Sequence, residues 1–128
     1  MEKIFYEGIV NWAYDHEIQE MDYAERYFIR HISFSPPLSR HYGAFYLTDN
    51  AIILEGENDH IKIYLTEINQ LFLGFDDVYS NASAKNFGLF WKPLRITFDD
   101  SKVIYLVIDY KFGFTANNQI FELLKEIC

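Results

Sequence analysis

The chain has 128 residues, of which 50% are hydrophobic and 23% charged, and its formal net charge is −8. This length suits one domain with a single core, and the composition excludes a disordered chain. The negative charge argues against nucleic acid and anionic lipid as partners, because both repel acidic proteins. Aromatic residues make up 19% of the chain and favour a fold built mainly from β-strands.

Targeting signals are missing from the printed sequence. The single cysteine, Cys128, cannot form an internal disulfide, which agrees with a reducing compartment. The first residues lack the basic and then apolar layout of a signal peptide. The apolar runs are all shorter than the roughly 18 residues that a membrane-spanning helix needs. We therefore expect a soluble, cytoplasmic protein.

Residues 1–25 carry seven acidic residues and one lysine. From Ile9 onward the apolar residues follow helical spacing, although residues 4–6 would also suit the start of a strand. We favour a helix within residues 9–25. We expect residues 1–25 to form an acidic N-terminal extension that packs on a domain of residues 26–128. The acidic surface is either simply solvated or a docking site for a basic partner.

The middle of the chain predicts short strands. Residues 27–34 alternate between two faces, and Pro36-Pro37 ends this strand because proline has no ladder donor. Residues 43–56 predict a β-hairpin, since two apolar alternating runs flank the turn formers at 48–50. In this hairpin Phe45, Leu47, Ile52 and Leu54 share one face. In the next strand Ile61, Ile63 and Leu65 point inward, and His60, Lys62 and Tyr64 point outward.

The last third predicts further strands and a closing helix. Residues 71–75 resume the strand pattern, 76–93 are irregular, and 94–98 alternate again. Residues 103–108 are apolar on both faces, as expected of a strand that a helix covers. A helix starts near Asn117, with Thr115 or Asn117 as its cap. Its predicted apolar stripe consists of Ile120, Phe121, Leu124 and Ile127.

These patterns carry a resemblance. The run Gly43-Ala-Phe-Tyr-Leu-Thr-Asp-Asn-Ala-Ile-Ile-Leu resembles the Gly-x-Leu-x-Leu-Thr-x-x-x-Leu-Ile-Phe hairpin of GRAM and bacterial PH-like domains. Ile61-Lys-Ile-Tyr-Leu-Thr-Glu-Ile is similar to the step that follows in them, and the later hairpin and closing helix match in order. The resemblance covers about residues 27–127. It implies a bent barrel or sandwich of six to seven antiparallel strands, capped at one end by the C-terminal α-helix.

Motifs for catalysis or metal binding are not found in the sequence. The four histidines lack metal-ligand spacing, and no second thiol is present. The pairs Asp76-Asp77 and Asp99-Asp100 fall at predicted turns, where aspartate bonds to the backbone. Hydrolase, Walker-type and dinucleotide-binding signatures are also absent. We expect no catalytic residue, no metal and no cofactor.

Phosphoinositide binding is the familiar activity of PH domains, and it uses basic residues on the first two strands. Here Arg26, Arg30, Arg40 and His41 are available, but residues 43–48 contain no basic residue. The family's basic motif is therefore not met. Membrane lipid binding is disfavoured, with Arg30 and Arg40 as the residues that would carry it.

The most informative surface candidate is the segment 75–92, where aromatic residues stand among small and polar ones. Aromatic side chains on a loop can anchor a protein partner, but they can also fold back as a lid over the open barrel. Exposure of Phe90 and Trp91 would distinguish the two. The candidate binding residues of this segment are Tyr79, Phe87, Phe90, Trp91 and Lys92.

We therefore expect a non-catalytic interaction or scaffold module with a protein partner. One alternative is a small-molecule-binding or enzymatic α+β cone of the NTF2-like kind, which depends on N-terminal helices. The second is a peripheral membrane module that binds lipid. Unpaired edge strands also favour a homodimer.

Overall fold

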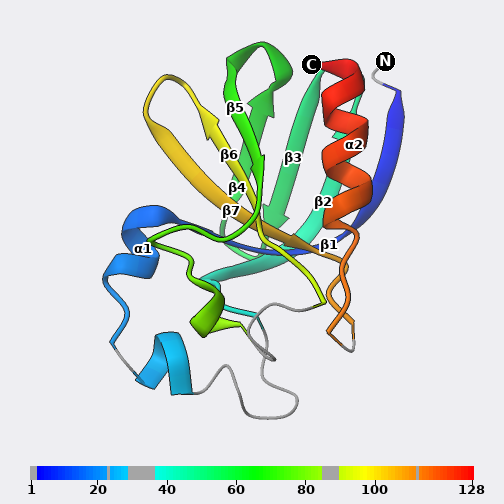
Figure 1. Ribbon diagram of the computed structural model, residues 1–128. Helices are drawn as coiled ribbons and strands as arrows, with labels where there is room; N and C mark the ends of the chain where they lie inside the picture. The colour runs from blue at the N-terminus through cyan, green and yellow to red at the C-terminus, as the bar shows by residue number, and fades with distance from the viewer. Residues whose placement is uncertain (1–2, 23, 29–36, 85–89, 112) are drawn as a thin grey trace.

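The computed structural model describes residues 3–22, 24–28, 37–84, 90–111 and 113–128. Seven antiparallel strands form one curled sheet in the order β4-β3-β2-β1-β7-β6-β5, and helix α2 lies against its mouth (Figure 1). This confirms the predicted mainly β class with a C-terminal helix. The elements are β1 (Ile4–Tyr14), α1 (Asp15–Gln19), β2 (His41–Thr48), β3 (Ala51–Gly56), β4 (His60–Tyr64), β5 (Ile68–Leu73), β6 (Leu94–Phe98), β7 (Lys102–Ile108) and α2 (Asn117–Ile127).

The N-terminal segment departs from the expectation. Residues 9–14 are not helical, because they belong to β1, which pairs with both β2 and β7 at the centre of the sheet. Val10 and Trp12 face one core and Ala13 faces another, so the apolar run shows no clear alternation and imitates helical spacing. Within the expected range, the described α-helical residues are the five of α1. Residues 4–14 are thus an integral strand, and not an extension that packs on the domain.

The prediction of a strand at residues 27–34 is wrong for its first two residues. Ala24–Phe28 form a π-helical turn, and residues 29–34 lie outside the described residues. Local hydrogen bonds favour this turn, since the Asp22 carboxylate accepts from Glu25 N–H at 2.8 Å and the Asp22 carbonyl accepts from Arg26 N–H at 3.0 Å. These bonds outweigh the strand preference of Tyr27.

The hairpin at 43–56 is confirmed as β2 and β3. Phe45, Leu47, Ile52 and Leu54 are buried on its inner face, and Ile63 of β4 joins them. Thr48 anchors the turn, because its hydroxyl accepts from Ala51 N–H at 3.0 Å. The two strands approach closely at Gly43, where an added Cβ would lie 2.0 Å from the Glu55 carbonyl oxygen. Only glycine fits there without moving the backbone.

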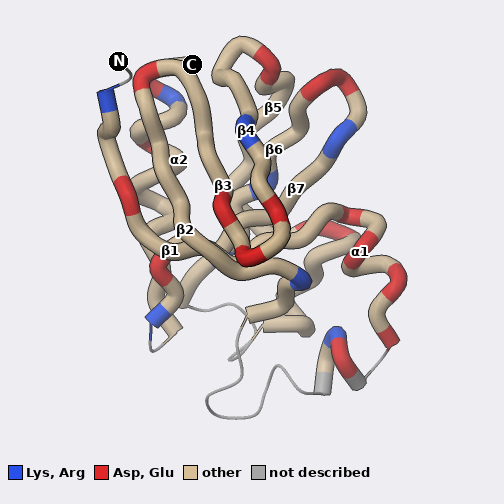
Figure 2. Tube along the Cα trace, turned by 180° about the vertical axis from the view of Figure 1, so that it is seen from behind, with Lys and Arg blue, Asp and Glu red and all other residues tan. Residues whose placement is uncertain are grey.

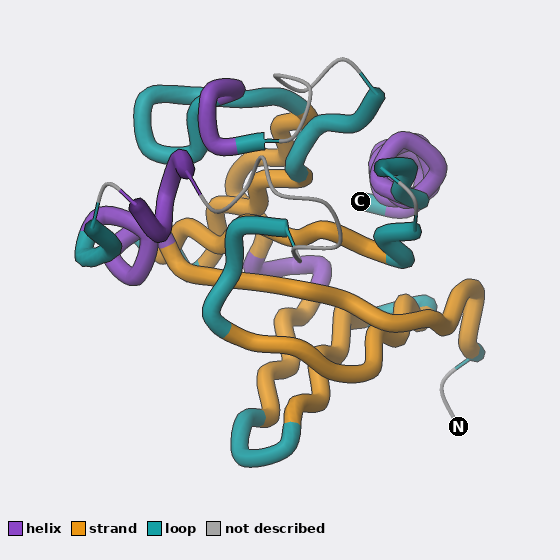
Figure 3. Tube along the Cα trace, turned by 90° about the horizontal axis from the view of Figure 1, so that it is seen from below, coloured by secondary structure: helices purple, strands orange, loops and turns teal. Residues whose placement is uncertain are grey.

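The first core fills the concave side of the sheet. Ile120 and Leu124 of α2 are fully buried in it, with Phe121 and Ile127 packed at its edge, as the predicted stripe requires. Helix α2 contacts β5 and β7 and lies apart from α1 and the short helical turns (Figure 3). In the part of the chain that the structure describes, no helix is long and apolar enough to span a bilayer.

A second core covers the convex side of β7 and β1. Tyr105 and Val107 point outward from β7 and are buried beneath Tyr79, Trp91 and Ile18. Phe75, Tyr79 and Trp91 of the 75–92 segment therefore do fold back onto the protein, but on the outside of the sheet and not over its mouth. This explains why β7 is apolar on both faces: α2 contacts it on one side and these loops cover it on the other.

The buried side chain of Asn117 joins α2 to the sheet. Its Oδ1 accepts from Ile108 N–H at 2.9 Å, and its Nδ2 donates to the carbonyl oxygens of Leu106 at 3.0 Å and Lys92 at 2.7 Å. These backbone groups lie at the end of the β6–β7 ladder, next to the first residue of β6, so Asn117 extends the hydrogen bonding beyond the last strand pair. The expected cap by Thr115 or Asn117 is wrong, because the N-cap residue is Ala116 and no side chain caps the helix; the Thr115 hydroxyl accepts from Asn117 N–H at 3.2 Å.

Replacing Asn117 tests this connection. Asn117→Ala would leave three buried backbone groups without partners, so we expect the free energy of unfolding to fall by about 2–4 kcal/mol. Urea unfolding followed by circular dichroism measures the change. Asn118→Ala, at the exposed neighbouring position on the same helix, is the matched control and should change the stability by less than about 0.5 kcal/mol. Equal effects of the two substitutions would contradict the role assigned to Asn117.

Candidate functional site

The structure separates the predicted binding residues into three groups. Tyr79 and Trp91 are only 0% and 6% exposed, so both belong to the second core and cannot anchor a partner. Phe90 is 55% exposed, and Lys92 is exposed two residues further on. Phe87 and Arg30 lie outside the described residues. Exposure of Phe90 and Trp91 was expected to distinguish a binding loop from a core lid. The two residues give different answers, because Phe90 lies on the surface and Trp91 in the core.

Phe90 does not stand alone on the surface. Its ring lies 5.8 Å from that of Phe114, which is 60% exposed and comes from the loop between β7 and α2. Lys111 forms a tight turn with Phe114 through two backbone hydrogen bonds of 2.9 and 3.0 Å. We call Phe90, Lys92, Lys111 and Phe114 the aromatic tip. Sequence analysis missed Phe114, although the glycine before it, with φ +82°, marks a turn that presents the next side chain.

An open hollow of about 450 Å³ adjoins the aromatic tip. Phe114, Thr115 and Ala116 provide its apolar part, and Asp109 and Lys111 provide charged groups. A partner that covers the two phenylalanine rings could place a further side chain in this hollow. The arrangement suits a contact surface, in which aromatic anchors sit beside a pocket and charged groups lie at the rim.

Asp109 directs the chain from β7 into the loop that carries Phe114. Its backbone is left-handed, with φ +52°, and its N–H donates to the Ile9 carbonyl oxygen at 2.8 Å. Its carboxylate accepts from Ile9 N–H at 2.8 Å and from the Tyr6 hydroxyl. Burial, followed by this hydrogen bond to Asp109, raises the pKa of Tyr6 to about 12. Gly8 makes room, since a Cβ there would lie 2.5 Å from an Asp109 carboxylate oxygen.

Trp91 fixes the other side of the aromatic tip. Its ring packs against Phe75, Tyr79 and Tyr110 at 6.0, 6.2 and 5.8 Å. The residue next to an exposed Phe90 is therefore held inside the second core. A rigid base of this kind lowers the entropy that an aromatic anchor loses on binding.

A second polar cluster centres on Asp76. Its carboxylate accepts hydrogen bonds from the Tyr105 hydroxyl at 2.7 Å, the Arg95 guanidinium at 2.9 Å, and the backbone N–H groups of Val78 and Tyr79 at 2.9 and 2.8 Å. Burial raises the pKa of Asp76, but these hydrogen bonds outweigh it and the net pKa is lowered. Burial and the bond to Asp76 raise the pKa of Tyr105.

This Asp76 cluster lines an open groove of about 410 Å³ on the outside of the sheet. The Asp76 carboxylate accepts hydrogen bonds from the loop that follows β5 and from side chains of the strands β6 and β7 beneath it. The cluster therefore attaches the loop to the sheet, and that role accounts for all of its polar contacts given above. We assign it to structure.

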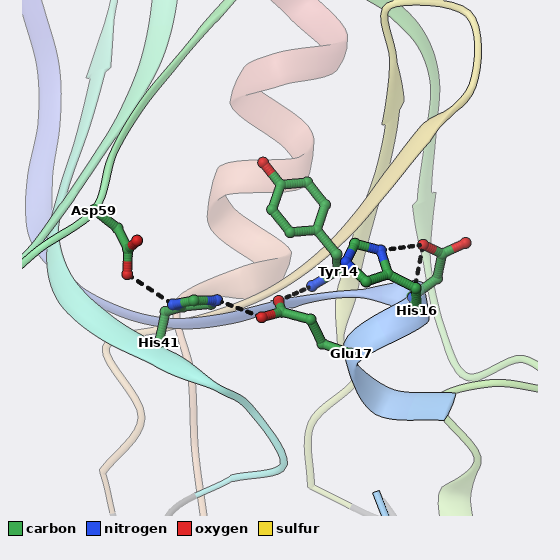
Figure 4. Close-up of polar contacts among 6 residues, drawn as sticks. Tyr14, His16, Glu17, His41 and Asp59 are labelled. Atoms are coloured by element: carbon green, nitrogen blue, oxygen red, sulfur yellow. Dashed lines mark hydrogen bonds and ion pairs between the residues drawn. The ribbon is translucent and has the colours of Figure 1, made fainter. Parts of the chain in front are cut away.

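A third cluster joins α1 to β2. The His41 ring nitrogens lie 2.7 Å from a Glu17 oxygen and 2.8 Å from an Asp59 oxygen, and the ring stacks on Trp12 at 5.3 Å (Figure 4). Glu17 also accepts from Tyr14 N–H at 2.9 Å. The two carboxylates lie on opposite sides of the imidazole, so they do not converge on a common point. This arrangement holds the chain together and does not form a metal centre.

Of the basic residues considered for lipid phosphates, Arg40 and Arg26 already have partners within the protein, and Arg30 lies outside the described residues. The Arg40 guanidinium forms an ion pair with Glu25, and this bond raises the pKa of Arg40. Arg26 donates to the Val78 carbonyl oxygen at 2.8 Å. Within the described ranges, no group of three or more histidine, cysteine, aspartate or glutamate residues could hold a metal ion.

Comparison with known proteins gives the fold alone. No model of a protein family matches the sequence, and no curated protein sequence does. Among solved structures, the chain is similar to the C-terminal domain of an unknown protein from Leishmania infantum, with a TM-score of 0.55 and 11% sequence identity. The match covers 98% of this chain and 83% of that domain structure.

The Asp76 cluster predicts a pH-dependent stability. Because the pKa of Asp76 is lowered on folding, its contribution is present above the unfolded pKa of about 3.9 and is lost as the pH falls through the folded value. We expect Asp76→Asn to lower the free energy of unfolding by about 1–2 kcal/mol at pH 7, and by less at pH 3. Asp77→Asn, at an exposed position, is the control for urea unfolding at both pH values. A loss that does not change with pH would contradict the assignment.

The different burial of neighbouring aromatic residues gives a second test. Trp91→Ala would open a cavity in the second core, so we expect a loss of about 3–5 kcal/mol in the free energy of unfolding. Phe90→Ala removes an exposed ring and should change it by less than about 0.5 kcal/mol. Urea unfolding of the two variants measures both. If Phe90→Ala destabilises as much as Trp91→Ala, the aromatic tip is part of the core.

Proposed function

We propose that the chain is a non-catalytic, PH-like interaction module whose aromatic tip binds a segment of a protein partner. The observation that carries the proposal is the exposed pair Phe90–Phe114, held at the surface beside a buried Trp91. Exposed apolar patches mark contact surfaces in many proteins, and aromatic residues are enriched among the residues that dominate interface energies.

The architecture supports the PH-like part of the proposal. The resemblance implies six to seven antiparallel strands with a closing helix, and the sheet of seven strands closed by α2 agrees with it. The resembling hairpin coincides with β2 and β3. The N-terminal helices that an NTF2-like cone needs are not found in residues 4–14, which form β1. That alternative is therefore the weaker candidate.

The charge distribution suggests the chemistry of the partner. The protein has a net charge of −8, with acidic residues spread over its loops and α1 (Figure 2). Lys92 and Lys111, in contrast, lie close in the chain to Phe90 and Phe114. A segment with apolar side chains and one or two carboxylates would complement both features. A lipid surface is the second candidate, because aromatic rings beside lysines also favour an anionic bilayer, but the net charge opposes it.

The polar clusters support a role without catalysis. The Asp76 cluster attaches a loop to the sheet, and the His41 cluster joins α1 to β2. Their titratable groups are bound to one another in structural contacts. We also propose a cytoplasmic location, because the single cysteine cannot form an internal disulfide and this agrees with a reducing compartment.

A peptide library tests the aromatic tip. Random peptides displayed on phage are selected on the immobilised full chain and then tested on the double variant Phe90→Ser/Phe114→Ser. We expect enriched peptides with aromatic or aliphatic residues beside aspartate or glutamate, and at least a tenfold loss of affinity for the double variant. Tyr64→Ser, which removes a ring that is 46% exposed on β4, is the matched control and should bind as the unaltered chain does.

Vesicle sedimentation separates the lipid alternative. Phosphatidylcholine vesicles with and without phosphatidylserine are pelleted with the chain and with the double variant. No sedimentation is expected. Sedimentation that depends on phosphatidylserine and on the two phenylalanines, together with failure of the peptide selection, would replace the protein partner with a membrane surface. Peptides that bind the double variant equally well would overturn the site.

A further inference from the structure

The convex side of β1 to β4 exposes apolar residues over four neighbouring strands. Ile9 and Tyr42 are 46% and 59% exposed, and Tyr46 and Ile53 between them are partly exposed. The second core covers the same side of the sheet at β7 and the end of β1, but its residues do not extend over β2 to β4. We call the residues of β1 to β4 that point to this side the outer face.

The strand register arranges the outer face in rows. Glu7 pairs with Tyr46, Tyr46 with Ile53, and Ile53 with Lys62, so one row crosses all four strands. This row carries an acid at the β1 end, a base at the β4 end and two apolar residues between them.

The neighbouring row has a compatible composition. It runs from Ile9 through Ala44 and Glu55 to His60, and His60 Nδ1 lies 3.4 Å from a Glu55 carboxylate oxygen. The apolar end of this row is on β1 and its polar end is on β4. Across these two rows, the side chains of the outer face therefore differ in polarity and charge between the β1 side and the β4 side of the sheet.

We propose that the outer face binds a second copy of this chain, with the two-fold axis parallel to the strands. This axis exchanges the β1 side with the β4 side, so Glu7 of one copy lies opposite Lys62 of the other, and Tyr46 lies opposite Ile53. Each dimer then gains two ion pairs across a small apolar centre. A face that is self-complementary in this way is the requirement for a two-fold interface.

The charge pattern excludes the other simple symmetry. A two-fold axis across the strands would place Glu7 opposite Glu7 and Lys62 opposite Lys62, and like charges repel. With the axis parallel to the strands, the two sheets keep nearly the same strand direction, which is the common aligned arrangement of packed sheets. The pattern thus fixes both the occupant and its orientation.

The size of the face sets the expected affinity. Four strands about 4.8 Å apart, each contributing about five residues, give a contact roughly 19 Å wide and 17 Å long. This falls below the roughly 800 Å² per partner of a standard stable interface. We therefore expect weak, transient association. The aromatic tip lies outside this face, so the dimer and the proposed function are independent.

Charge reversal with rescue tests the dimer. Sedimentation velocity is measured for the full chain between about 1 and 300 μM, for Glu7→Lys, for Lys62→Glu and for the double variant. We expect each single reversal to weaken the dimer at least tenfold and the double reversal to restore it to within about threefold. Lys125→Glu and Glu122→Lys, which make the same charge changes on α2, are the matched controls and should leave dimerisation unchanged.

A disulfide cross-link between two copies tests the same dimer if a charge-reversal variant fails to fold. In a Cys128→Ser background, Glu7→Cys and Lys62→Cys are introduced into separate chains, which are mixed and oxidised. We expect a disulfide between the two different chains and little between identical chains. A chain that remains monomeric throughout the concentration range would overturn the proposal. Failure of the double reversal to restore dimerisation, or cross-linking only between identical chains, would overturn it as well.

Discussion

The fold depends on one constraint: the last residues of β1, from Val10 onward, lie beside β7 at the centre of the sheet, and this part of the sheet is packed on both faces. Trp12, Ile104 and Leu106 face the core beneath α2, while Ala13, Tyr105 and Val107 face the core beneath the outer loops. Neither helix nor loop could be removed without exposing this pair of strands. Asn117 adds the polar counterpart, because it supplies hydrogen bonds to β7 where β6 no longer does.

The second core explains where the exposed features are found. In the loops that cover β7, Tyr79 and Trp91 of the 75–92 segment are buried. Phe90 of the same segment stays at the surface beside Phe114. The described residues of this core do not extend over the convex side of β2 to β4. The aromatic tip and the outer face are thus two consequences of the same packing. One presents aromatic anchors on loops, and the other presents a patterned sheet surface.

Sequence patterns predicted the elements in which one face is buried and the other exposed. The alternation at 43–56 and 60–64 and the stripe of α2 were predicted correctly for this reason. The pattern failed at Trp12-Ala13-Tyr14, because burial on both faces removes the alternation that marks a strand. Asn117 resembled a helix cap, since its buried role depends on groups far away in the chain. Phe114 was missed because its exposure follows from the short turn that Lys111 and Phe114 close.

The central position of β1 separates this account most directly from a domain with a peripheral N-terminal extension. Amide hydrogen exchange, followed residue by residue by nuclear magnetic resonance, measures it. The amides of residues 10–14 and 104–108 that bond across these strands should be among the slowest in the protein and should exchange only through global unfolding. If the amides of residues 10–14 exchange within minutes while those of β2 and β3 remain protected, the N-terminal segment is peripheral and the account is wrong.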